Sequence, residues 1–419
     1  MTTASRAVKN GSERPMKSDR VNGPQPMRSK DSTVTRSMLA VMMFMVVGAC
    51  GSSGRPLTTL NPRGDAARII HDLISPVFII AGVVFVIINF GVLFLAVKFR
   101  RGDSEEWPKQ VHGNTALELG WTIVPALILA GVAVGTVTTL FKLDDTPETD
   151  IEVTVYGQQW WWSYDYDLNA DGEPDFSTAN ELVIPAGKAV SLKVKSNDVI
   201  HSFWIPALNG KRDAVPGRTH PWWLEADEPG VYYGQCTEFC GLSHAKMQMR
   251  TIALEPAEYE AWVANQMQDA AIPTDQAALR GLSVFTQQCA SCHQIEGVNA
   301  VDCVPDGATN GCFAGTAPYD GAEVVSGLAP NLTHLMSRSS YAGSIFELYD
   351  DEPSAANYLT KEGLNVDRAQ LKAWIRNPSA LKPMAPNPNE FSELGRGMPA
   401  LPLTEDQLDD LVTYLETLK

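Results

Sequence analysis

Two long apolar runs near the N-terminus constrain this 419-residue chain more than any other feature. The first covers Ile74 to Val97 and the second covers Leu119 to Phe141, and each can cross a hydrocarbon core of about 30 Å as a helix. The loop between them contains the basic residues Lys98, Arg100, Arg101 and Lys109. By the positive-inside rule this loop is cytoplasmic and the long C-terminal part lies outside. The sequence predicts a transmembrane hairpin over residues 65–145, with two core helices of a soluble domain as the alternative.

Residues 1–49 have the layout of an export signal. A polar, basic stretch precedes a short apolar run from Met38 to Ala49, which is typical of a signal peptide. The run ends in Ala49-Cys50-Gly51 and resembles a bacterial lipobox, in which Cys50 becomes the lipidated first residue of the mature chain. A plain hydrophobic anchor with an inert cysteine is the alternative.

The overall charge and the cysteine spacing narrow the function further. A net charge of −16 argues against a nucleic-acid partner and suits an exported domain that meets a basic partner. The chain has 7 cysteines at uneven spacings, which indicates separate uses rather than one disulfide framework. Cys303 and Cys312 lie in a Gly-rich exported insert and are predicted to form a disulfide. Two free thiols are the alternative.

From residue 150 the pattern changes to short β-type runs separated by turns that contain Gly, Pro, Asn or Asp. Strands at this spacing predict an all-β sandwich or Greek-key barrel over residues 150–265. Loops on such a rigid scaffold often carry binding sites. The predicted strands are 151–156, 163–167, 181–184, 190–194 and 231–234.

A stretch of this domain is dense in metal-binding side chains: Cys236-Thr237-Glu238-Phe239-Cys240-Gly241-Leu242-Ser243-His244-Ala245-Lys246-Met247. Thiolate, thioether and imidazole donors together select copper over hard cations. Two cysteines with a Glu carbonyl between them can bridge two metals, and His201 is the candidate for a second imidazole. A Cys-x3-Cys pair alone is a weak signal, because many such pairs are disulfides or zinc ligands. The full pattern is far more demanding.

An acidic segment after the second predicted strand admits two interpretations. Asp167, Asn169 and Asp171 alternate and are followed by Gly172, which resembles the first half of a calcium-binding loop. The bidentate Glu that closes a calcium loop at about the twelfth position is replaced by Thr178. An acidic, Asx-rich hairpin turn is the alternative.

A second cofactor motif follows a linker near residues 271–274. Cys289-Ala290-Ser291-Cys292-His293 is the attachment signature of a c-type haem. The thiols of Cys289 and Cys292 form thioethers to the haem, and His293 becomes an axial iron ligand. A redox Cys-x-x-Cys pair and zinc ligation are the rivals, weakened because His follows directly and no second Cys pair matches.

The other axial ligand is expected to be a downstream Met or His, since Met/His ligation is found in cytochromes c. Met398 is the preferred candidate and Met384 is its rival, while Met336 is assigned to the core. Residues 404–418 have helical spacing of apolar side chains, which predicts a terminal helix.

Together these residues carry a family resemblance. Residues 65–265 resemble subunit II of the haem–copper cytochrome c oxidases, whose exported domain is a cupredoxin with a dinuclear copper A centre. Beside the cysteine stretch, the supporting segments are 157–164, 213–218 and 232–236. Residues 275–419 resemble a class I cytochrome c, in which Pro330 would pack near His293 and His334 would be a hydrogen-bonding loop residue.

The resemblance implies a role for each metal-binding residue. Cys236 and Cys240 would bridge both coppers. His201 and His244 would each bind one copper. Met247 and the carbonyl of Glu238 would be the weak axial ligands.

The resemblance also implies roles for groups around the copper pair. The Glu238 carboxylate would face a magnesium site shared with subunit I, and His244 would lie towards haem a. Trp160 would be the aromatic surface residue through which electrons enter, with core packing as the alternative for the Trp160-Trp161-Trp162 run. Glu118 would stand at the mouth of a proton channel, with an interface residue that reaches water as the alternative.

The sequence thus predicts a multi-domain chain made of a two-helix transmembrane hairpin, an all-β cupredoxin Greek-key barrel and an all-α cytochrome c domain. The predicted function is the electron-accepting subunit of a proton-pumping aerobic oxidase in a bacterial cell membrane. Its expected partners are subunit I with haem a and copper B, subunit III, and a cytochrome c or cytochrome bc-type complex as donor. The alternatives are a copper A and haem c protein of the nitrous oxide or nitric oxide reductase type, and a non-catalytic copper-binding protein.

Overall fold

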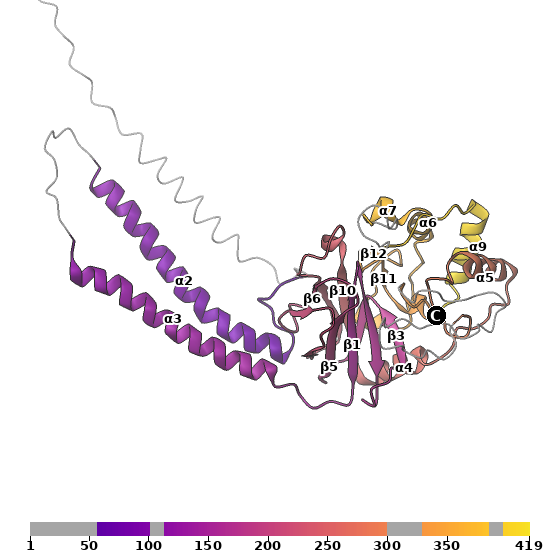
Figure 1. Cartoon of the computed structure of the whole chain (residues 1–419), viewed down its shortest axis with the longest axis horizontal. Helices are drawn as coiled ribbons and strands as arrows, with labels where there is room; N and C mark the ends of the chain where they lie inside the picture. The colour runs from indigo at the N-terminus through magenta and orange to yellow at the C-terminus, as the bar shows by residue number, and fades with distance from the viewer. Residues whose placement is uncertain (1–56, 101–112, 300–328, 385–396) are drawn as a thin grey trace, which may run out of the picture. The chain divides into compact units, whose positions relative to one another are not determined.

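The computed structural model describes residues 57–100, 113–299, 329–384 and 397–419, which are coloured in Figure 1. Cys50, Cys303 and Cys312 lie outside these ranges, and so does the predicted signal segment 1–49. Lipidation of Cys50 and a disulfide between Cys303 and Cys312 therefore stay predictions.

Two long helices form the hairpin that the apolar runs predict. Helix α2 spans Asp65–Lys98 and helix α3 spans Thr115–Asp144, and the two helices contact each other. Both are long and apolar enough to cross a membrane (Figure 1). Each helix begins before its predicted apolar run. Its first turns are helical but contain polar residues, so they are not part of the apolar run. Asn114 caps α3, since its side chain accepts a hydrogen bond from the amide of Leu117.

The next part of the chain is the predicted all-β fold, here called the β domain (residues 151–266). Its strands form a five-stranded sheet in the order β3-β2-β1-β5-β8, a three-stranded sheet in the order β4-β10-β9, and a β6–β7 pair. Alternate residues of β1, β2 and β5 are buried, as expected for a sheet with one face on the core. The strands are β1 (Glu152–Gln158), β2 (Trp161–Asp167), β3 (Phe176–Ala179), β4 (Glu181–Pro185), β5 (Val190–Ser196), β6 (His201–Phe203), β7 (Arg212–Ala214), β8 (His220–Leu224), β9 (Gly230–Gln235) and β10 (Gln248–Leu254).

Helix α4 (Pro256–Gln266) completes the β domain. Trp262 is almost fully buried in the core of the sheets, where its ring makes an edge contact with Tyr166 at 5.3 Å between centroids. The helix ends at Gln266, and the residues after Met267 turn towards the C-terminal domain, where the amide of Ala270 donates to the carbonyl of Glu296.

The acidic segment after β2 is a hairpin turn whose carboxylates accept hydrogen bonds from its own backbone. Asp167 accepts from the amides of Asp171 and Gly172 at 3.1 and 2.7 Å. Asn169 accepts from the amide of Asp171 at 3.0 Å. These bonds are those of an Asx-rich turn, and calcium binding by this segment stays a prediction.

The C-terminal domain (residues 275–419) is built on two packed helices, α5 (Gln276–Gln288) and α9 (Glu405–Leu415). Gly281 allows the close approach, because a Cβ at this position would lie 2.0 Å from the carbonyl oxygen of Asp410. Arg280 adds a bidentate ion pair with Asp410. The other elements are the short 3-10 turns η2 (Leu335–Ser337) and η3 (Ala355–Asn357), the strands β11 (Ser340–Tyr341) and β12 (Phe346–Glu347), and the helices α6 (Arg368–Arg376) and α7 (Pro378–Leu381).

Candidate copper and haem sites

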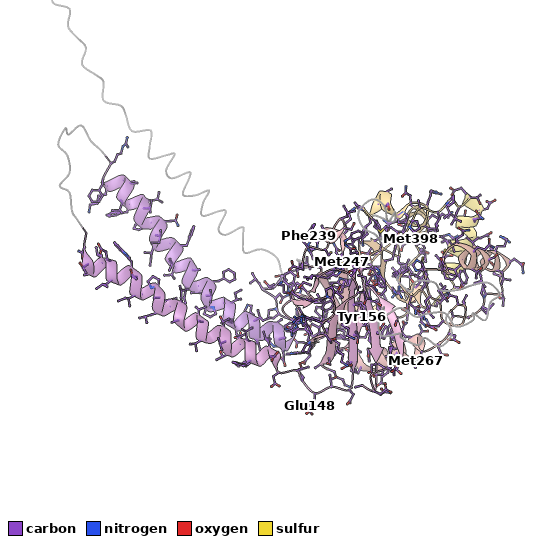
Figure 2. The ribbon with its side chains drawn as sticks, in the orientation of Figure 1. Glu148, Tyr156, Phe239, Met247, Met267 and Met398 are labelled. Carbon is purple, nitrogen blue, oxygen red and sulfur yellow. The ribbon has the colours of Figure 1, made fainter. Side chains whose placement is uncertain are left out.

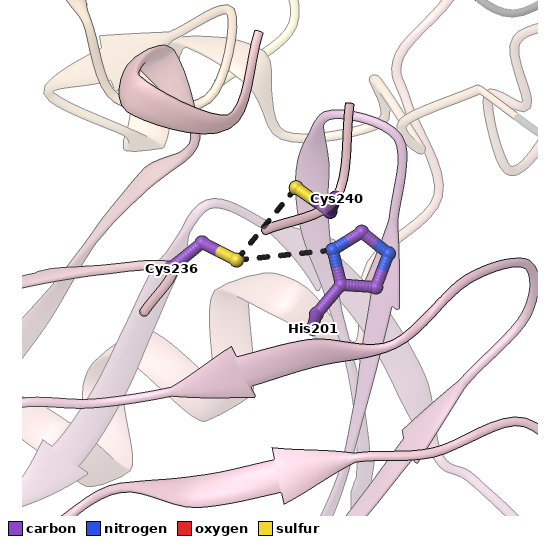
Figure 3. Close-up of side chains that lie close together, drawn as sticks. All are labelled: His201, Cys236 and Cys240. Carbon is purple, nitrogen blue, oxygen red and sulfur yellow. Dashed lines mark hydrogen bonds between the residues drawn. The ribbon is translucent and has the colours of Figure 1, made fainter. Parts of the chain in front are cut away.

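The sulfurs of Cys236 and Cys240 lie at the centre of the predicted copper site. They are 3.8 Å apart, and the Cys236 sulfur is 3.9 Å from Nδ1 of His201 (Figure 3). A disulfide would bring the sulfurs to about 2.05 Å. Two donors that share one metal at bond lengths of 2.0–2.3 Å stand roughly 3.5 Å apart. The observed spacing therefore suits donors around shared metal ions.

The remaining predicted donors surround the same two sulfurs. The carbonyl oxygen of Glu238 lies 3.3 Å from the Cys236 sulfur. Nδ1 of His244 lies 3.6 Å, and the Met247 sulfur 3.8 Å, from the sulfur of Cys240. Figure 2 shows Met247 and Phe239 at the end of the β domain that carries this loop. The structure thus brings together the whole donor set that the sequence predicts.

The scaffold explains why these donors converge. Cys236 directly follows β9 and Met247 directly precedes β10, so the donor stretch is the loop between paired strands. The amide of Cys236 donates to the carbonyl of Met247 at 2.9 Å, which closes the loop at its base. We call residues 236–247 the copper loop. Its ends are fixed by the sheet before any metal binds.

His201 reaches the site from β6, and a neighbouring carboxylate orients its ring. Nε2 of His201 lies 2.7 Å from the carboxylate of Asp198, and both side chains are almost fully buried. This contact leaves Nδ1 to face Cys236, as outer carboxylates do for metal-binding histidines. Gly157 makes room for the ring, because a Cβ there would lie 2.8 Å from it. Sequence analysis missed Asp198, although its position three residues before a predicted ligand was a usable signal.

The two thiols cannot both ionise without a cation. The hydrogen bond with Cys240 and that with His201 lower the pKa of Cys236, although burial opposes the change. The same contact with Cys236 and burial raise the pKa of Cys240. Two thiolates this close repel each other, so a positive ion between them is needed to hold both in the deprotonated form. This electrostatic demand fits a bridged metal pair.

The expected surface position of Trp160 is wrong. Its side chain is 4% exposed, and its Nε1 donates to the carbonyl of Cys240 at 3.0 Å. The C-terminal domain covers this region: Nζ of Lys382 donates to the carbonyl of Trp160 at 2.6 Å and to that of Ala342 at 2.7 Å. Burial lowers the pKa of Lys382 to about 7. Trp160 therefore lies directly between a copper-loop residue and the C-terminal domain, and its role in electron transfer stays a prediction.

The haem attachment motif directly follows α5. The thiol of Cys289 is buried, that of Cys292 is exposed, and burial raises the pKa of Cys289 to about 12. Nδ1 of His293 lies 2.8 Å from the carbonyl of Pro330, which leaves Nε2 for another partner. This is the arrangement expected of an axial histidine whose second nitrogen donates to a carbonyl. Nε2 of His334 lies 2.9 Å from the carbonyl oxygen of Gln268, and its Nδ1 lies 2.7 Å from that of Lys419. His334 is thus placed as a hydrogen-bonding loop residue.

The two candidate axial methionines pack against different cores. Met398 contacts the core of the C-terminal domain, which also contains Cys289. Met384 contacts the core of the β domain. Met336 is buried in the C-terminal core, as predicted. The packing therefore favours Met398 over Met384 as a partner for the group attached at Cys289.

The two remaining predicted site groups are the carboxylates of Glu118 and Glu238. Glu118 is on the first turns of α3, where its carboxylate accepts a hydrogen bond from the amide of Asn114 at 3.2 Å. Glu238 is half-buried. Within the described ranges, the His, Cys, Asp and Glu side chains that gather closely enough to hold a metal are His201, Cys236 and Cys240.

Comparisons with known proteins match three successive parts of the chain. The family models match in order: cytochrome c oxidase subunit II, transmembrane domain, over residues 64–138; its periplasmic domain over 167–254; and cytochrome c over 278–419. The cytochrome c oxidase subunit 2 of Alkalihalophilus pseudofirmus is 35% identical over 395 residues, which cover 92% of this chain and 98% of that protein. The chain belongs to the cytochrome c oxidase subunit II family.

Two further subunit II proteins are similar to this chain. Cytochrome c oxidase subunit 2 of Bacillus sp. strain PS3 is 30% identical, over 90% of this chain and 95% of that protein. The solved periplasmic domain of subunit II of cytochrome oxidase from Bradyrhizobium japonicum is 34% identical, covers 29% of this chain and 96% of that chain, and has a TM-score of 0.27.

As a subunit II, the protein is part of a haem–copper oxidase and is anchored in the membrane by α2 and α3, with its periplasmic domain outside. The predicted combination of a membrane hairpin, a cupredoxin-type β domain and a cytochrome c domain is confirmed. Subunit II membership also separates the chain from the alternative of a non-catalytic copper-binding protein.

Proposed function

We propose that this subunit II takes electrons at a c-type haem in its C-terminal domain, passes them to a dinuclear copper centre in its β domain, and delivers them to haem a of subunit I. Oxygen reduction to water and proton pumping then take place in subunit I, which carries copper B. The donor is a cytochrome c or a cytochrome bc-type complex, and subunit III completes the oxidase.

The convergence of the copper-loop donors with His201 carries this proposal. Cys236 and Cys240 would bridge the metals, and His201 and His244 would each bind one. Met247 and the Glu238 carbonyl would be the weak ligands. When bound, the copper pair and the haem supply one-electron carriers. The chain's own contribution is a rigid donor set, because the paired strands and Asp198 hold the ligands before the metal arrives.

The haem side of the proposal rests on three side chains and their surroundings. Cys289 and Cys292 would form the thioethers, and His293 would bind iron through Nε2, because Nδ1 faces the Pro330 carbonyl. Met398 would be the second axial ligand, as its packing against the core that contains Cys289 supports. Trp160, whose carbonyl accepts from Lys382, would lie on the electron path into the copper loop.

The delivery side of the proposal rests on exposed groups. Phe239 is 77% exposed and Leu242 is 50% exposed on the copper loop, which is unusual for apolar side chains beside a metal site. We propose that subunit I covers them, with His244 towards haem a and the Glu238 carboxylate on a shared magnesium ion. Glu118 is proposed to stand at the mouth of a proton channel.

The optical spectrum of the purified full-length chain, loaded with copper and haem, tests the proposal. We expect a c-type haem band on reduction and a purple, mixed-valence copper absorption in the oxidised protein. Cys236→Ser should abolish the purple absorption completely, because one bridging thiolate is lost, while the haem band remains as an internal control. One copper per chain, or a purple Cys236→Ser variant, would contradict the dinuclear centre.

A further inference from the structure

A network of buried polar side chains joins the β domain to the C-terminal domain outside the copper loop. Its centre is formed by Glu181 on β4 and Arg250 on β10, which stand directly opposite each other in the parallel pairing of these strands. Glu181 is 1% exposed and Arg250 is 4% exposed. Charged side chains are almost never this buried unless they are paired.

The direct hydrogen-bond donors to Glu181 come from the C-terminal domain. The backbone amide of Ser339 donates to its carboxylate at 2.9 and 3.0 Å, and the hydroxyl of Ser340 donates at 2.6 Å. The hydroxyl of Tyr358 donates to the other carboxylate oxygen at 2.6 Å. Tyr358 itself is buried within the core of the β domain, although it belongs to the C-terminal domain in sequence.

Arg250 also contacts the C-terminal domain, through two carboxylates. Its guanidinium donates to the carboxylate of Glu347 at 2.9 Å and lies 3.0 Å from that of Glu352. Glu352 also accepts from the hydroxyl of Tyr233 on β9 at 2.6 Å. The β domain therefore holds two buried charges of opposite sign, and the C-terminal domain supplies polar partners to both.

The need to satisfy both buried charges makes this surface of the β domain selective. A buried charge is tolerated only where hydrogen bonds or an opposite charge compensate for its lost hydration. Burial alone would raise the pKa of Glu181, but Arg250, Lys361 and the serine donors hold it below its ordinary value. A different protein docked here would have to supply the same donors in the same places, or leave a carboxylate and a guanidinium unsatisfied.

We propose that Glu181 and Arg250 form a docking lock that holds the chain's own C-terminal domain in one fixed position on the β domain. The lock deepens the proposed function, on which it rests, because it makes the haem donor a rigid part of the subunit rather than a tethered one. A close backbone contact agrees with a fixed position: a Cβ on Gly343 would lie 2.8 Å from the Trp160 carbonyl oxygen.

Hydrogen exchange of the full-length protein tests the lock without any redox readout. Glu181→Gln keeps the shape of the side chain but removes its charge, so it should speed exchange of the segment around the Ser339 amide by about tenfold, as for a lost charged hydrogen bond. Exchange in α5 and α9 should not change, because the C-terminal domain stays folded. Glu173→Gln, which removes an exposed charge from the same domain, should leave all these rates unchanged. Unchanged exchange around Ser339 in Glu181→Gln would overturn the lock.

The rate of electron transfer from haem to copper, started by a photoreductant that reduces the haem, gives the second readout. We expect a viscosity-independent rate in the wild type and a slower, viscosity-dependent rate in Glu181→Gln, because the domains must then search for each other. The absorption spectra of both centres should not change. A wild-type chain that holds both centres and transfers no electron contradicts the proposed function, whereas equal rates in both proteins contradict only the lock.

Tyr358→Phe keeps the test available if Glu181→Gln does not fold. It removes one donor to Glu181 and leaves the buried ring in place, so it should produce a smaller change of the same kind in exchange and in viscosity dependence. In the double variant the two effects should be less than multiplicative, because both act through the same hydrogen bond. Fully multiplicative effects would show that the two residues act separately.

Discussion

The copper loop has one set of residues that the chain covers and another that it leaves exposed. On the covered side, the hydroxyl of Ser243 donates to the Pro383 carbonyl at 2.5 Å, Lys246 donates to the Leu381 carbonyl at 2.7 Å, and Trp160 meets Lys382. These contacts are polar and specific. They join the loop to one short segment of the C-terminal domain, residues 381–383.

The exposed set is apolar. It consists of Phe239 and Leu242 in the loop, which are 77% and 50% exposed, together with Val199 and Ile200 directly before the predicted ligand His201, which are 38% and 46% exposed. Polar contacts fix geometry, whereas apolar surface supplies most of the free energy of association. Under the proposed function, electrons would arrive from a domain held in a set geometry and would leave through a surface that a separate subunit covers.

Leu242→Asp tests the exposed side and carries the largest expected effect. A charge in the centre of an apolar interface must be desolvated on binding, which costs about 2 kcal/mol or more and weakens association roughly 30-fold. We expect subunit I to be lost from the detergent-purified oxidase. The copper and haem spectra of the free subunit should be unchanged.

Leu359→Asp is the matched control for this experiment. Leu359 is 36% exposed on the C-terminal domain, so the same charge is introduced on an apolar side chain away from the copper loop. Subunit I should co-purify with this variant as with the wild type. If both variants, or neither, retain subunit I, the exposed side of the copper loop is not its binding surface.

Lys382→Met tests the covered side. The variant keeps the length of the side chain but removes the donor to the carbonyls of Trp160 and Ala342. Loss of a buried hydrogen-bond donor costs about 1–3 kcal/mol, so the contact should loosen and haem-to-copper transfer should slow by about tenfold. Subunit I should remain bound.

Flash-induced transfer kinetics measure this effect, with Lys372→Met as the control. Lys372 pairs with Asp409 in the same domain, away from the copper loop, so its loss changes the charge equally. A Lys382→Met protein that transfers electrons at the wild-type rate would show that the covered side does not depend on this contact.

The copper loop and its contacts with the C-terminal domain also differ in how far they could be predicted from the sequence. The ligands of the copper loop were predictable because they are close in sequence and their chemistry is restrictive. The hairpin helices and strands β1, β2, β4, β5 and β9 follow from apolar periodicity. Strands β3, β6, β7, β8 and β10 were missed. The three-residue strands β6 and β7 carry no periodic signal, and β10 does not alternate because it is buried at nearly every position.

Contacts between residues far apart in the sequence were not predictable. Lys382 and Trp160 are 222 positions apart, and Tyr358 and Glu181 are 177 apart. Nothing in the local pattern around a Lys or a Glu indicates that a second domain will bury it. The family resemblance implied a surface position for Trp160, and no local pattern indicated that Lys382 would contact its carbonyl. The error came from treating the two domains as independent units.

Asp165→Asn carries the smallest expected effect. It measures how much free energy of folding a desolvated carboxylate costs when the C-terminal domain supplies no hydrogen-bond donors to it, in contrast to Glu181. Asp165 lies on β2, where the hydroxyl of Ser177 donates to it at 2.6 Å. Burial raises its pKa from 3.8 to about 6, although Ser177 and Lys195 oppose the change. Glu181, with donors from the C-terminal domain, has a lowered pKa instead.

The sign of the pH effect follows from the raised pKa of Asp165. The folded state holds this proton more tightly, so stability is greatest below the unfolded pKa of 3.8 and falls as the pH rises towards about 6. The full shift corresponds to at most about 3 kcal/mol, and partial exposure reduces it to about 1–2 kcal/mol. Asp165→Asn should therefore stabilise the β domain by that amount at neutral pH and flatten its pH dependence in this window.

Unfolding followed by tryptophan fluorescence, with Glu173→Gln as the control, measures both the stability and its pH dependence. A variant less stable than the wild type at neutral pH would mean that the Ser177 hydrogen bond stabilises the fold by more than the burial of Asp165 costs. The contributions of Asp165 and Glu181 to stability would then differ less than their surroundings suggest.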